Sequence, residues 1–325
     1  MELQLKNIGM IKEANVKIDG LTVIAGENDT GKSTVGKALY LQLKSMEDIL
    51  DGELVEDIFD DNMTQKGSIS LIYDGYVWRN SFEDNMFSDD IEVFLYNNKK
   101  KLSEKMINKK NPKLDSIVVE TPLVWNFMKL FNQLPLIESQ VKILIKTPRL
   151  MKDLHFKLSF SNKKKGILLN RKITSIIDGQ FQQDEKGDFF FNKNDNRIEL
   201  INTATGIKYF GIFQILSENN HLNENTVLVL DEPEVHLHPK WQLEMAKIIV
   251  ELVKNGVKIV VNSHSPYMLE ALKRYSELQE IEEKTNFYLA EDGYIEQQDS
   301  LENIFEKLAL PMRELKELKM AKYLK

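Results

Sequence analysis

The sequence predicts a mixed α/β fold, and three segments carry the prediction. An apolar run at 21–25 is followed by a glycine-rich loop and then by apolar residues at helical spacing, the order of a strand, a loop and a helix. A second apolar run at 226–230 ends in two carboxylates, and a third at 258–261 ends close to a histidine. Side chains at the carboxyl ends of parallel strands meet at one edge of the sheet. We therefore expect the three segments to converge on one site.

The loop after the first strand reads G-x-x-x-x-G-K-S-T, the pattern that binds phosphate. Its residues are Gly26, Glu27, Asn28, Asp29, Thr30, Gly31, Lys32, Ser33 and Thr34. The glycines let the backbone approach a triphosphate, and the N–H groups of the loop and of the next helix face the phosphates. Lys32 brings a positive charge to the β- and γ-phosphates, and the Ser33 hydroxyl can bind Mg2+. A glycine-rich turn that binds nothing would not need this strand and helix around it.

Two carboxylates follow the second strand directly, at Asp231 and Glu232. Like charges repel, so two acids at the end of a buried strand suggest chemistry rather than packing. We interpret Asp231 as the carboxylate that holds Mg2+, usually through water, and Glu232 as the base that orients or deprotonates the attacking water. The alternative is an exposed acidic turn.

Histidines mark the two loops nearest to this acidic pair. His264 ends the third strand, where an imidazole can hydrogen-bond the γ-phosphate or the attacking water; a purely structural histidine is the alternative. His236 and His238, together with Glu234, could form a metal site, but no third nitrogen or sulfur ligand is evident nearby.

Composition and charge limit the class of protein. The chain has 325 residues, 42% of them hydrophobic, which is enough for a substantial core. A net charge of −7 argues against a uniformly basic nucleic-acid surface, although seven lysines within 99–113 could contact DNA or RNA phosphates or form a solvated face. The absence of cysteine excludes disulfides and thiolate metal sites. With no signal-peptide pattern and no long apolar stretch, we expect a cytoplasmic protein that does not enter the membrane.

The remaining segments predict an antiparallel β part and an inserted helical part. Alternating apolar residues predict hairpins at 1–17 and 67–82 and a strand at 91–96. Further expected elements are a strand at 116–120, helices at 123–134, 137–145 and 149–158, strands within 173–200, a helix at 210–216, strands at 286–289 and 294–297, and a helix at 301–307. We expect one composite domain, in which 1–115 and 196–325 form the nucleotide-binding core and 116–195 an inserted, mainly helical lobe with a β return.

Three strings together resemble the ABC-type ATPase heads of the SMC, RecF and OLD-like group. They are Gly26–Thr34, Val227–Pro239 (V-L-V-L-D-E-P-E-V-H-L-H-P) and Asn262–Pro266 (N-S-H-S-P). The D-E-P-E-x-H-L-H-P form is similar to stand-alone and OLD-like AAA family members, many of which belong to bacterial anti-phage defence systems. The resemblance implies a P-loop NTPase head with a mixed central sheet, an antiparallel β lobe and an inserted helical lobe. Residues 45–195 contribute little to it.

The resemblance also implies how such a head works. Two heads dimerise around two molecules of ATP, each held between the phosphate loop of one subunit and a signature motif of the other. Thr205 and Gly206, before the helix at 210–216, match the Ser-Gly of that motif and would bind a γ-phosphate in trans, whereas Ile207 and Lys208 depart from it. The loop 234–238 would cross to the partner subunit, which removes the need for a metal at its histidines. Glu120 or Thr121 is the candidate for the family's glutamine position.

The function implied is that of an Mg-ATP-binding and hydrolysing ATPase. It would dimerise on ATP and control or drive a partner effector in DNA-related processing or anti-phage defence. The alternative is a nucleotide-dependent scaffold that sequesters an effector, a toxin or a nuclease, with little turnover. OLD relatives continue into a Toprim nuclease domain, whereas this sequence has 61 residues after His264. We therefore expect no Toprim domain, and an effector on a separate chain.

Overall fold

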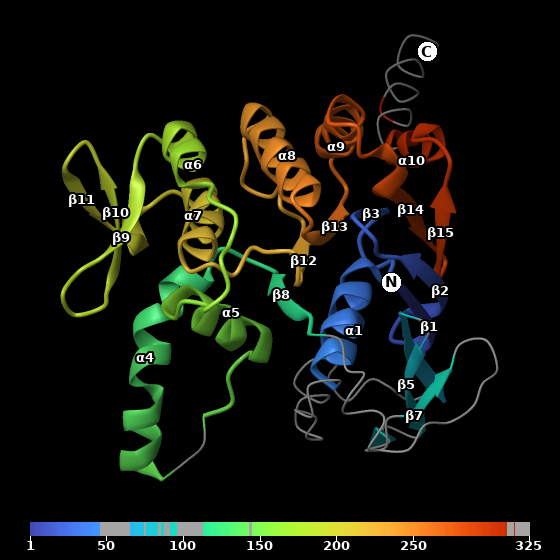
Figure 1. Ribbon diagram of the computed structural model, residues 1–325, viewed down its shortest axis with the longest axis horizontal. Coiled ribbons are helices and arrows are strands. Elements are labelled where there is room, and N and C mark those ends of the chain that lie inside the picture. Colours follow the sequence, from blue (N-terminus) through green and yellow to red (C-terminus); the bar gives the residue numbers. More distant parts are fainter. Residues whose placement is uncertain are drawn as a thin grey trace, which may run out of the picture.

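The computed structural model of the chain is shown in Figure 1 and describes residues 1–45, 66–74, 76–83, 86–87, 92–95, 113–142, 145–310 and 315. Most of the basic segment 99–113 therefore lies outside the described residues. In the described part, no helix is both long and apolar enough to cross a membrane.

Twelve described strands form one large mixed sheet, in the order β6-β5-β4-β1-β2-β15-β14-β3-β13-β12-β8, with β7 paired to β5. Their bounds are β1 Glu2–Ile8, β2 Ile11–Lys17, β3 Leu21–Ala25, β4 Gly67–Tyr73, β5 Tyr76–Glu83, β6 Met86–Phe87, β7 Glu92–Leu95, β8 Asp115–Val119, β12 Thr226–Asp231, β13 Lys258–Ser263, β14 Thr285–Glu291 and β15 Tyr294–Gln298. A smaller antiparallel sheet contains β9 Gln180–Gln183, β10 Phe189–Lys193 and β11 Asn196–Glu199. This architecture confirms the expected α/β class.

The large sheet changes from antiparallel to parallel along its width. β1 pairs antiparallel with β2 and β4, which confirms the first hairpin, and β4 pairs antiparallel with β5. β3 instead runs parallel to both β13 and β14, and β12 runs parallel to β13 and β8. The parallel strands β3 and β13 are almost completely buried, as their continuous apolar runs require. The carboxyl ends of β3, β12 and β13 consequently meet at one edge.

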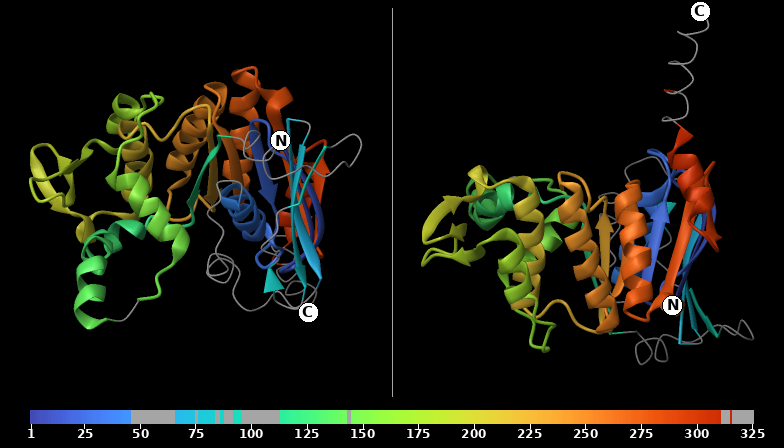
Figure 2. Two further views of the ribbon diagram at one scale, coloured as in Figure 1. Left: turned by 60° about the horizontal axis from the view of Figure 1, so that its bottom comes forward. Right: turned by 90° about the horizontal axis from the view of Figure 1, so that it is seen from above.

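The described helices are α1 Lys32–Ser45, α4 Val124–Val141, α5 Arg149–Ser159, α6 Asn170–Ile177, α7 Thr205–Glu218, α8 Pro239–Lys254, α9 Pro266–Leu278 and α10 Glu302–Leu308, with short 3-10 turns at Leu200–Asn202 and Glu282–Lys284. Alternate residues of β12 serve different faces of the sheet: Val227 and Val229 pack in one core with α1, and Leu228 and Leu230 pack in another with α7, α8 and α9. The parallel strands are therefore covered on both faces (Figure 2).

Two helix expectations were wrong in detail. Residues 124–141 form one helix, not two, and Pro135 lies inside it. Proline removes one intrahelical hydrogen bond but its φ is helical, and this helix continues beyond it. Residues 173–177 belong to α6 rather than to a strand, because Ile173 and Ile177 lie four apart and are both buried on one helical face.

The helices α4, α5 and α6 and the small sheet lie together on one side of the molecule, at the left in Figure 1. The strand β8, which precedes α4, pairs with β12 in the large sheet. The division expected from the sequence, with 116–195 as a lobe inserted between the core segments 1–115 and 196–325, remains our proposal.

A buried charge cluster joins this lobe to the amino-terminal end of β8. Lys157 on α5 forms an ion pair with Asp115, and His221 Nδ1 lies 3.8 Å from the other Asp115 carboxylate oxygen. Burial alone would raise the pKa of Asp115, but the neighbouring His221 and the charge of Lys157 outweigh it and lower that pKa to about 2. The ionised carboxylate is thus held by the folded state.

This pKa predicts an acid-sensitive contribution to stability. The folded-state pKa lies below the ordinary value of 3.8, so the contribution is present above pH 4 and is lost as pH falls toward 2. We expect Asp115→Asn to lower the free energy of unfolding at pH 7 by roughly 2 kcal/mol and to converge with the parent near pH 2. Urea denaturation across this range measures the difference, and the exposed Asp299→Asn is the control. A difference in the free energy of unfolding between the parent and Asp115→Asn that stays constant with pH would contradict the lowered pKa of Asp115.

Candidate nucleotide-binding site

The phosphate loop lies between β3 and α1, and its glycines occupy positions that no other residue fits. Gly31 has a φ of 88° and Gly26 a φ of 153°. A Cβ atom on Gly26 would lie 2.5 Å from the carbonyl oxygen of Ala290, and one on Gly31 would lie 2.8 Å from Ile11 Cγ1. The backbone is therefore held in a tight curve against β14 and β2, with α1 beginning at Lys32.

Lys32 is a buried cation enclosed by its own loop. Its side chain donates hydrogen bonds to the carbonyl oxygens of Gly26, at 2.9 Å, and of Glu27. Burial lowers the pKa of Lys32, while the nearby carboxylates of Glu232 and Asp231 oppose this shift. An ammonium at the start of a helix, with glycines around it, favours an anionic ligand.

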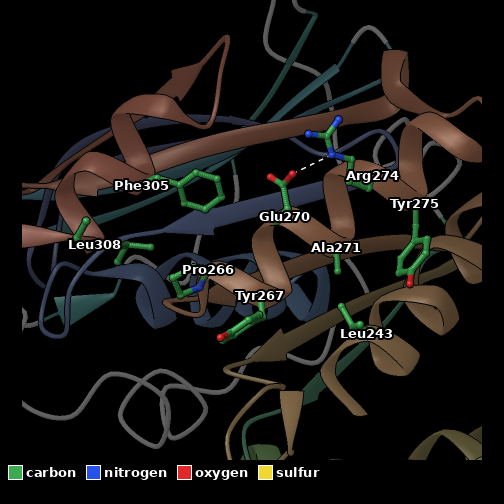
Figure 3. Close-up of a pocket in the computed structure, with 10 residues that line it drawn as sticks. Leu243, Pro266, Tyr267, Glu270, Ala271, Arg274, Tyr275, Phe305 and Leu308 are labelled. Carbon is green, nitrogen blue, oxygen red and sulfur yellow. Dashed lines mark hydrogen bonds and ion pairs between the residues drawn. The ribbon is translucent and has the colours of Figure 1, made fainter. Parts of the chain in front are cut away.

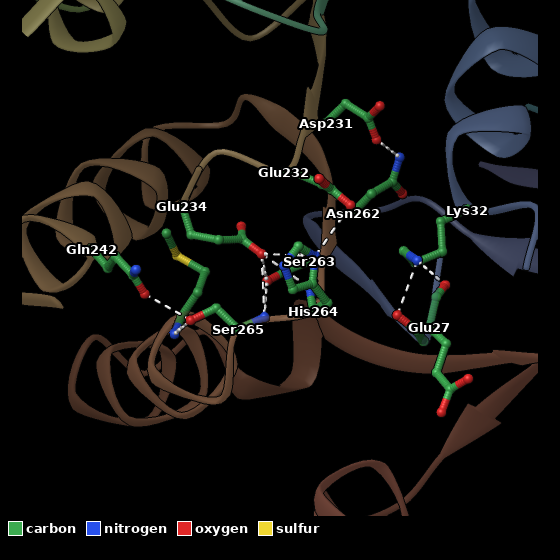
Figure 4. Close-up of polar contacts among 12 residues, drawn as sticks. Glu27, Lys32, Asp231, Glu232, Glu234, Gln242, Asn262, Ser263, His264 and Ser265 are labelled. Carbon is green, nitrogen blue, oxygen red and sulfur yellow. Dashed lines mark hydrogen bonds and ion pairs between the residues drawn. The ribbon is translucent and has the colours of Figure 1, made fainter. Parts of the chain in front are cut away.

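The predicted magnesium ligands contact each other directly. The Ser33 hydroxyl lies 3.0 and 2.9 Å from the two carboxylate oxygens of Asp231. Asn262 Nδ2 donates to Asp231 Oδ1 at 2.8 Å (Figure 4). These residues come from α1, β12 and β13, so the three segments do converge. The amide oxygen of Asn262 is buried and has no hydrogen-bond partner among the described residues. Asn262 begins the N-S-H-S-P string, but no role in the site was expected for it from the sequence.

Glu232 and His264 form a second pair beside the first. His264 Nδ1 lies 3.1 Å from Glu232 Oε1, and the Glu232 amide donates to the Asn262 carbonyl at 2.9 Å. Glu232 has a φ of 45°, an uncommon conformation that turns the chain sharply after β12. Both side chains are partly exposed, at 34% for Glu232 and 43% for His264, so water can reach them.

The loop after Glu232 is divided between buried and exposed residues. Glu234 and Leu237 are buried, whereas Val235 and His236 are exposed. His238 is the N-cap of α8, where its Nδ1 accepts a hydrogen bond from the Lys240 amide at 3.3 Å. The described residues contain no group of three histidine, aspartate or glutamate side chains arranged to hold a metal.

Thr205 and Gly206 lie at the first turn of α7. In Figure 1, α8 lies between α7 and α9. A Cβ on Gly206 would lie 3.1 Å from Leu237 Cδ2 and 3.2 Å from the His236 carbonyl oxygen, so α7 begins against the 234–238 loop. Lys208 points inward, where its ammonium donates to Asn126 Oδ1 at 2.7 Å. Glu120, at the end of β8, forms an ion pair with Lys37 at 3.5 Å.

An apolar groove of about 630 Å3 lies elsewhere, between α8, α9 and α10 (Figure 3). Leu243, Tyr267, Phe305 and Leu308 are among its lining residues, and none of the predicted site residues lines it. Triphosphate binding needs cationic and N–H donors, which the phosphate loop has and this groove largely lacks.

Residues 125–269 match the family model described as AAA ATPase domain, a region that includes Asp231, Glu232 and His264 but not the phosphate loop. A search of curated proteins found no significant match.

Two solved structures are similar over nearly the whole chain. One is the Smc head bound to the C-winged helix domain of ScpA, at 16% identity, covering 94% of this chain and 98% of that chain with a TM-score of 0.53. The other is the Pyrococcus furiosus Smc head domain with an extended coiled coil, bound to the C-terminal domain of ScpA, at 13% identity, 98% of each chain and a TM-score of 0.54. The chain therefore has the fold of an Smc head, as expected.

Proposed function

We propose that this protein binds Mg-ATP, dimerises on it and hydrolyses it, and in this way controls or drives a separate effector chain. The observation that carries the proposal is the contact of Ser33 with Asp231 beside the buried Lys32. These three groups come from two distant segments, and each has the chemistry that a magnesium-bound triphosphate requires.

The side chains fit a magnesium ion. Ser33 and Asp231 offer a hydroxyl and a carboxylate, the hard oxygen ligands that Mg2+ prefers, at adjacent positions. They would hold the ion directly or through water. When bound, Mg2+ neutralises charge on the phosphates.

The other residues supply the remaining roles in hydrolysis. Lys32 holds the β- and γ-phosphates, together with the N–H groups of residues 26–34. Glu232 takes a proton from, or orients, the attacking water, and its partial exposure gives water access to it. His264, through the nitrogen that does not face Glu232, donates to the γ-phosphate or the water.

The proposed dimer gives Thr205 and Gly206 a role that they lack within one chain. No side chain of the described residues caps the start of α7, so its first N–H groups and the Thr205 hydroxyl are donors that can bind a γ-phosphate held by the other subunit. Val235 and His236 are exposed beside it and would contact the partner subunit.

The biological setting is proposed from the sequence motifs. The D-E-P-E-x-H-L-H-P string supports a place in the OLD-like group and a cytoplasmic role in DNA-related processing or anti-phage defence. The effector would be a nuclease or toxin on another chain, and DNA is a candidate ligand through the 99–113 lysines.

A scaffold with little turnover is the second candidate. It is favoured by Lys208, which the signature motif does not normally contain and which here is turned inward to Asn126 rather than toward the outside. In this case ATP would stabilise an assembly that holds an effector inactive.

Nucleotide binding and turnover by the parent and by Lys32→Ala test the proposal. Loss of one charge-assisted contact to phosphate is expected to weaken ATP binding about tenfold to a hundredfold. Calorimetry measures binding and phosphate release measures turnover, with the exposed Lys12→Ala as the control. If the parent binds ATP without hydrolysing it, the result supports the scaffold function. If the parent does not bind ATP, both proposed functions are wrong.

A further inference from the structure

We propose that Glu234 is a positioning residue that holds His264 in place for hydrolysis, an inference that rests on the proposed function. The sequence resemblance placed Glu234 in a loop that crosses to another subunit. In the structure its side chain is only 4% exposed and faces inward, toward the loop that carries His264.

Glu234 accepts hydrogen bonds from three consecutive residues. Its Oε1 receives the Ser263 hydroxyl at 2.7 Å, the His264 amide at 2.9 Å and the Ser265 amide at 3.2 Å (Figure 4). Two of the donors are main-chain groups, so the carboxylate fixes the path of the backbone at His264 itself. His264 Nδ1 is 3.8 Å from the same oxygen and 3.1 Å from Glu232.

A buried carboxylate is a costly way to stabilise a loop. Removing a charge from water destabilises the fold unless hydrogen bonds or opposite charges compensate for it. The three donors and the start of α9, which follows at Pro266, offset part of that cost. Glu234 Oε2 nevertheless has no hydrogen-bond partner among the described residues. A contribution to the stability of the fold therefore does not readily explain an acid in this position. The geometry that Glu234 imposes on His264 explains it better.

Gln242 on α8 adds a second link between the same loops. Its Oε1 accepts from the Ser265 hydroxyl at 2.7 Å, and its Nε2 donates to the Leu237 carbonyl at 3.1 Å. The loop after Glu232 and the loop of His264 are thus joined at two points. Because Glu232 begins one loop and His264 lies in the other, the links set the orientation of this pair.

A substitution of Glu234 is expected to affect ATP turnover but not ATP binding. Among the described residues, no hydrogen bond or ion pair joins Glu234 to the phosphate loop or to Asp231, and its charge raises the pKa of Lys32 less than those of Glu232 and Asp231 do. ATP affinity should therefore depend little on it. In Glu234→Gln the amide keeps the size and one acceptor oxygen but loses the charge, and hydrogen bonds to a neutral acceptor are about half as strong. We expect kcat to fall about tenfold with KM within about twofold of the parent.

A double-mutant cycle with His264→Ala distinguishes positioning from general damage. If Glu234 acts through His264, Glu234→Gln should change kcat by less than about twofold in the His264→Ala background. Equal losses in both backgrounds, or parental turnover in the single variant, would overturn the inference. Glu270→Gln is the matched control, because it makes the same change at a residue of α9 whose side chain is 42% exposed and is paired with Arg274 at 2.8 Å.

Hydrogen exchange supplies a readout that does not depend on turnover. The amides of His264 and Ser265 both donate to Glu234, so their protection should fall in Glu234→Gln and stay at the parental level in Glu270→Gln. Unchanged protection would contradict the proposed geometry. A parent that fails to hydrolyse ATP, with protection lost as expected, would instead contradict the proposed function while leaving the contact established.

Discussion

ATP hydrolysis by Glu232→Gln is expected to be at least about a hundredfold slower than in the parent, the usual contribution of a general base. The substitution keeps the shape of the side chain but removes its ability to accept a proton. It leaves Lys32, Ser33 and Asp231 in place, so ATP binding should persist. The variant should therefore accumulate as an ATP-bound dimer, which size-exclusion chromatography with and without Mg-ATP detects and phosphate release quantifies.

The control for this experiment is again Glu270→Gln, which is expected to hydrolyse ATP like the parent. A Glu232→Gln protein that stays monomeric with ATP and turns over at the parental rate would show that Glu232 is not the base. Loss of ATP binding in the same variant would also contradict the assignment, because Glu232 is placed at the water rather than at the phosphates.

The largest effect on stability is expected from Trp125→Ala, at about 4 kcal/mol. Trp125 is 2% exposed, and its ring centroid lies 5.0 Å from that of Phe181 and 5.2 Å from that of Phe189. Its Nε1 donates to the Lys208 carbonyl at 2.8 Å, so alanine leaves a cavity and also removes this hydrogen bond to the first turns of α7. Urea denaturation measures the loss.

Two variants on α4 show whether this loss has the proposed cause. Trp125→Phe keeps most of the aromatic contact and should cost about half as much, chiefly through the lost hydrogen bond and the smaller ring. Phe127→Ala, two residues away on the same helix and 40% exposed, should change stability by less than about 1 kcal/mol. Similar losses at positions 125 and 127 would contradict the packing described.

The sequence predicted the structure best at the phosphate loop, where the apolar pattern and the phosphate-binding motif lie in one continuous segment. The strand before Gly26, the glycines of the loop and the helix from Lys32 follow from burial and backbone freedom, both of which are local properties. The convergence of Ser33, Asp231 and His264 followed from one general rule, that parallel strands place their carboxyl ends together.

The parts that could not be predicted depend on contacts between distant residues. Glu234 differs from an exposed acid only through the donors at 263–265, and Asn262 becomes a site residue only when β13 lies beside β12. Two helices were expected at 123–134 and 137–145, whereas α4 is continuous through Pro135. The packing of its buried residues against other elements cannot be read from the chain. The roles assigned to the site residues remain predictions that the variants above test.

The order of strands in the large sheet bears on how the protein is made. β3, which ends at the phosphate loop, has β13 and β14 as its neighbours, and these strands are more than 230 residues later in the chain. During synthesis, β3 leaves the ribosome long before β13 and β14 are made. Its backbone N–H and C=O groups therefore have no neighbouring strand to hydrogen-bond with until late in synthesis. Such sequence-distant pairing slows folding and exposes an apolar segment to aggregation meanwhile. The nucleotide site should thus be among the last parts of the molecule to assemble.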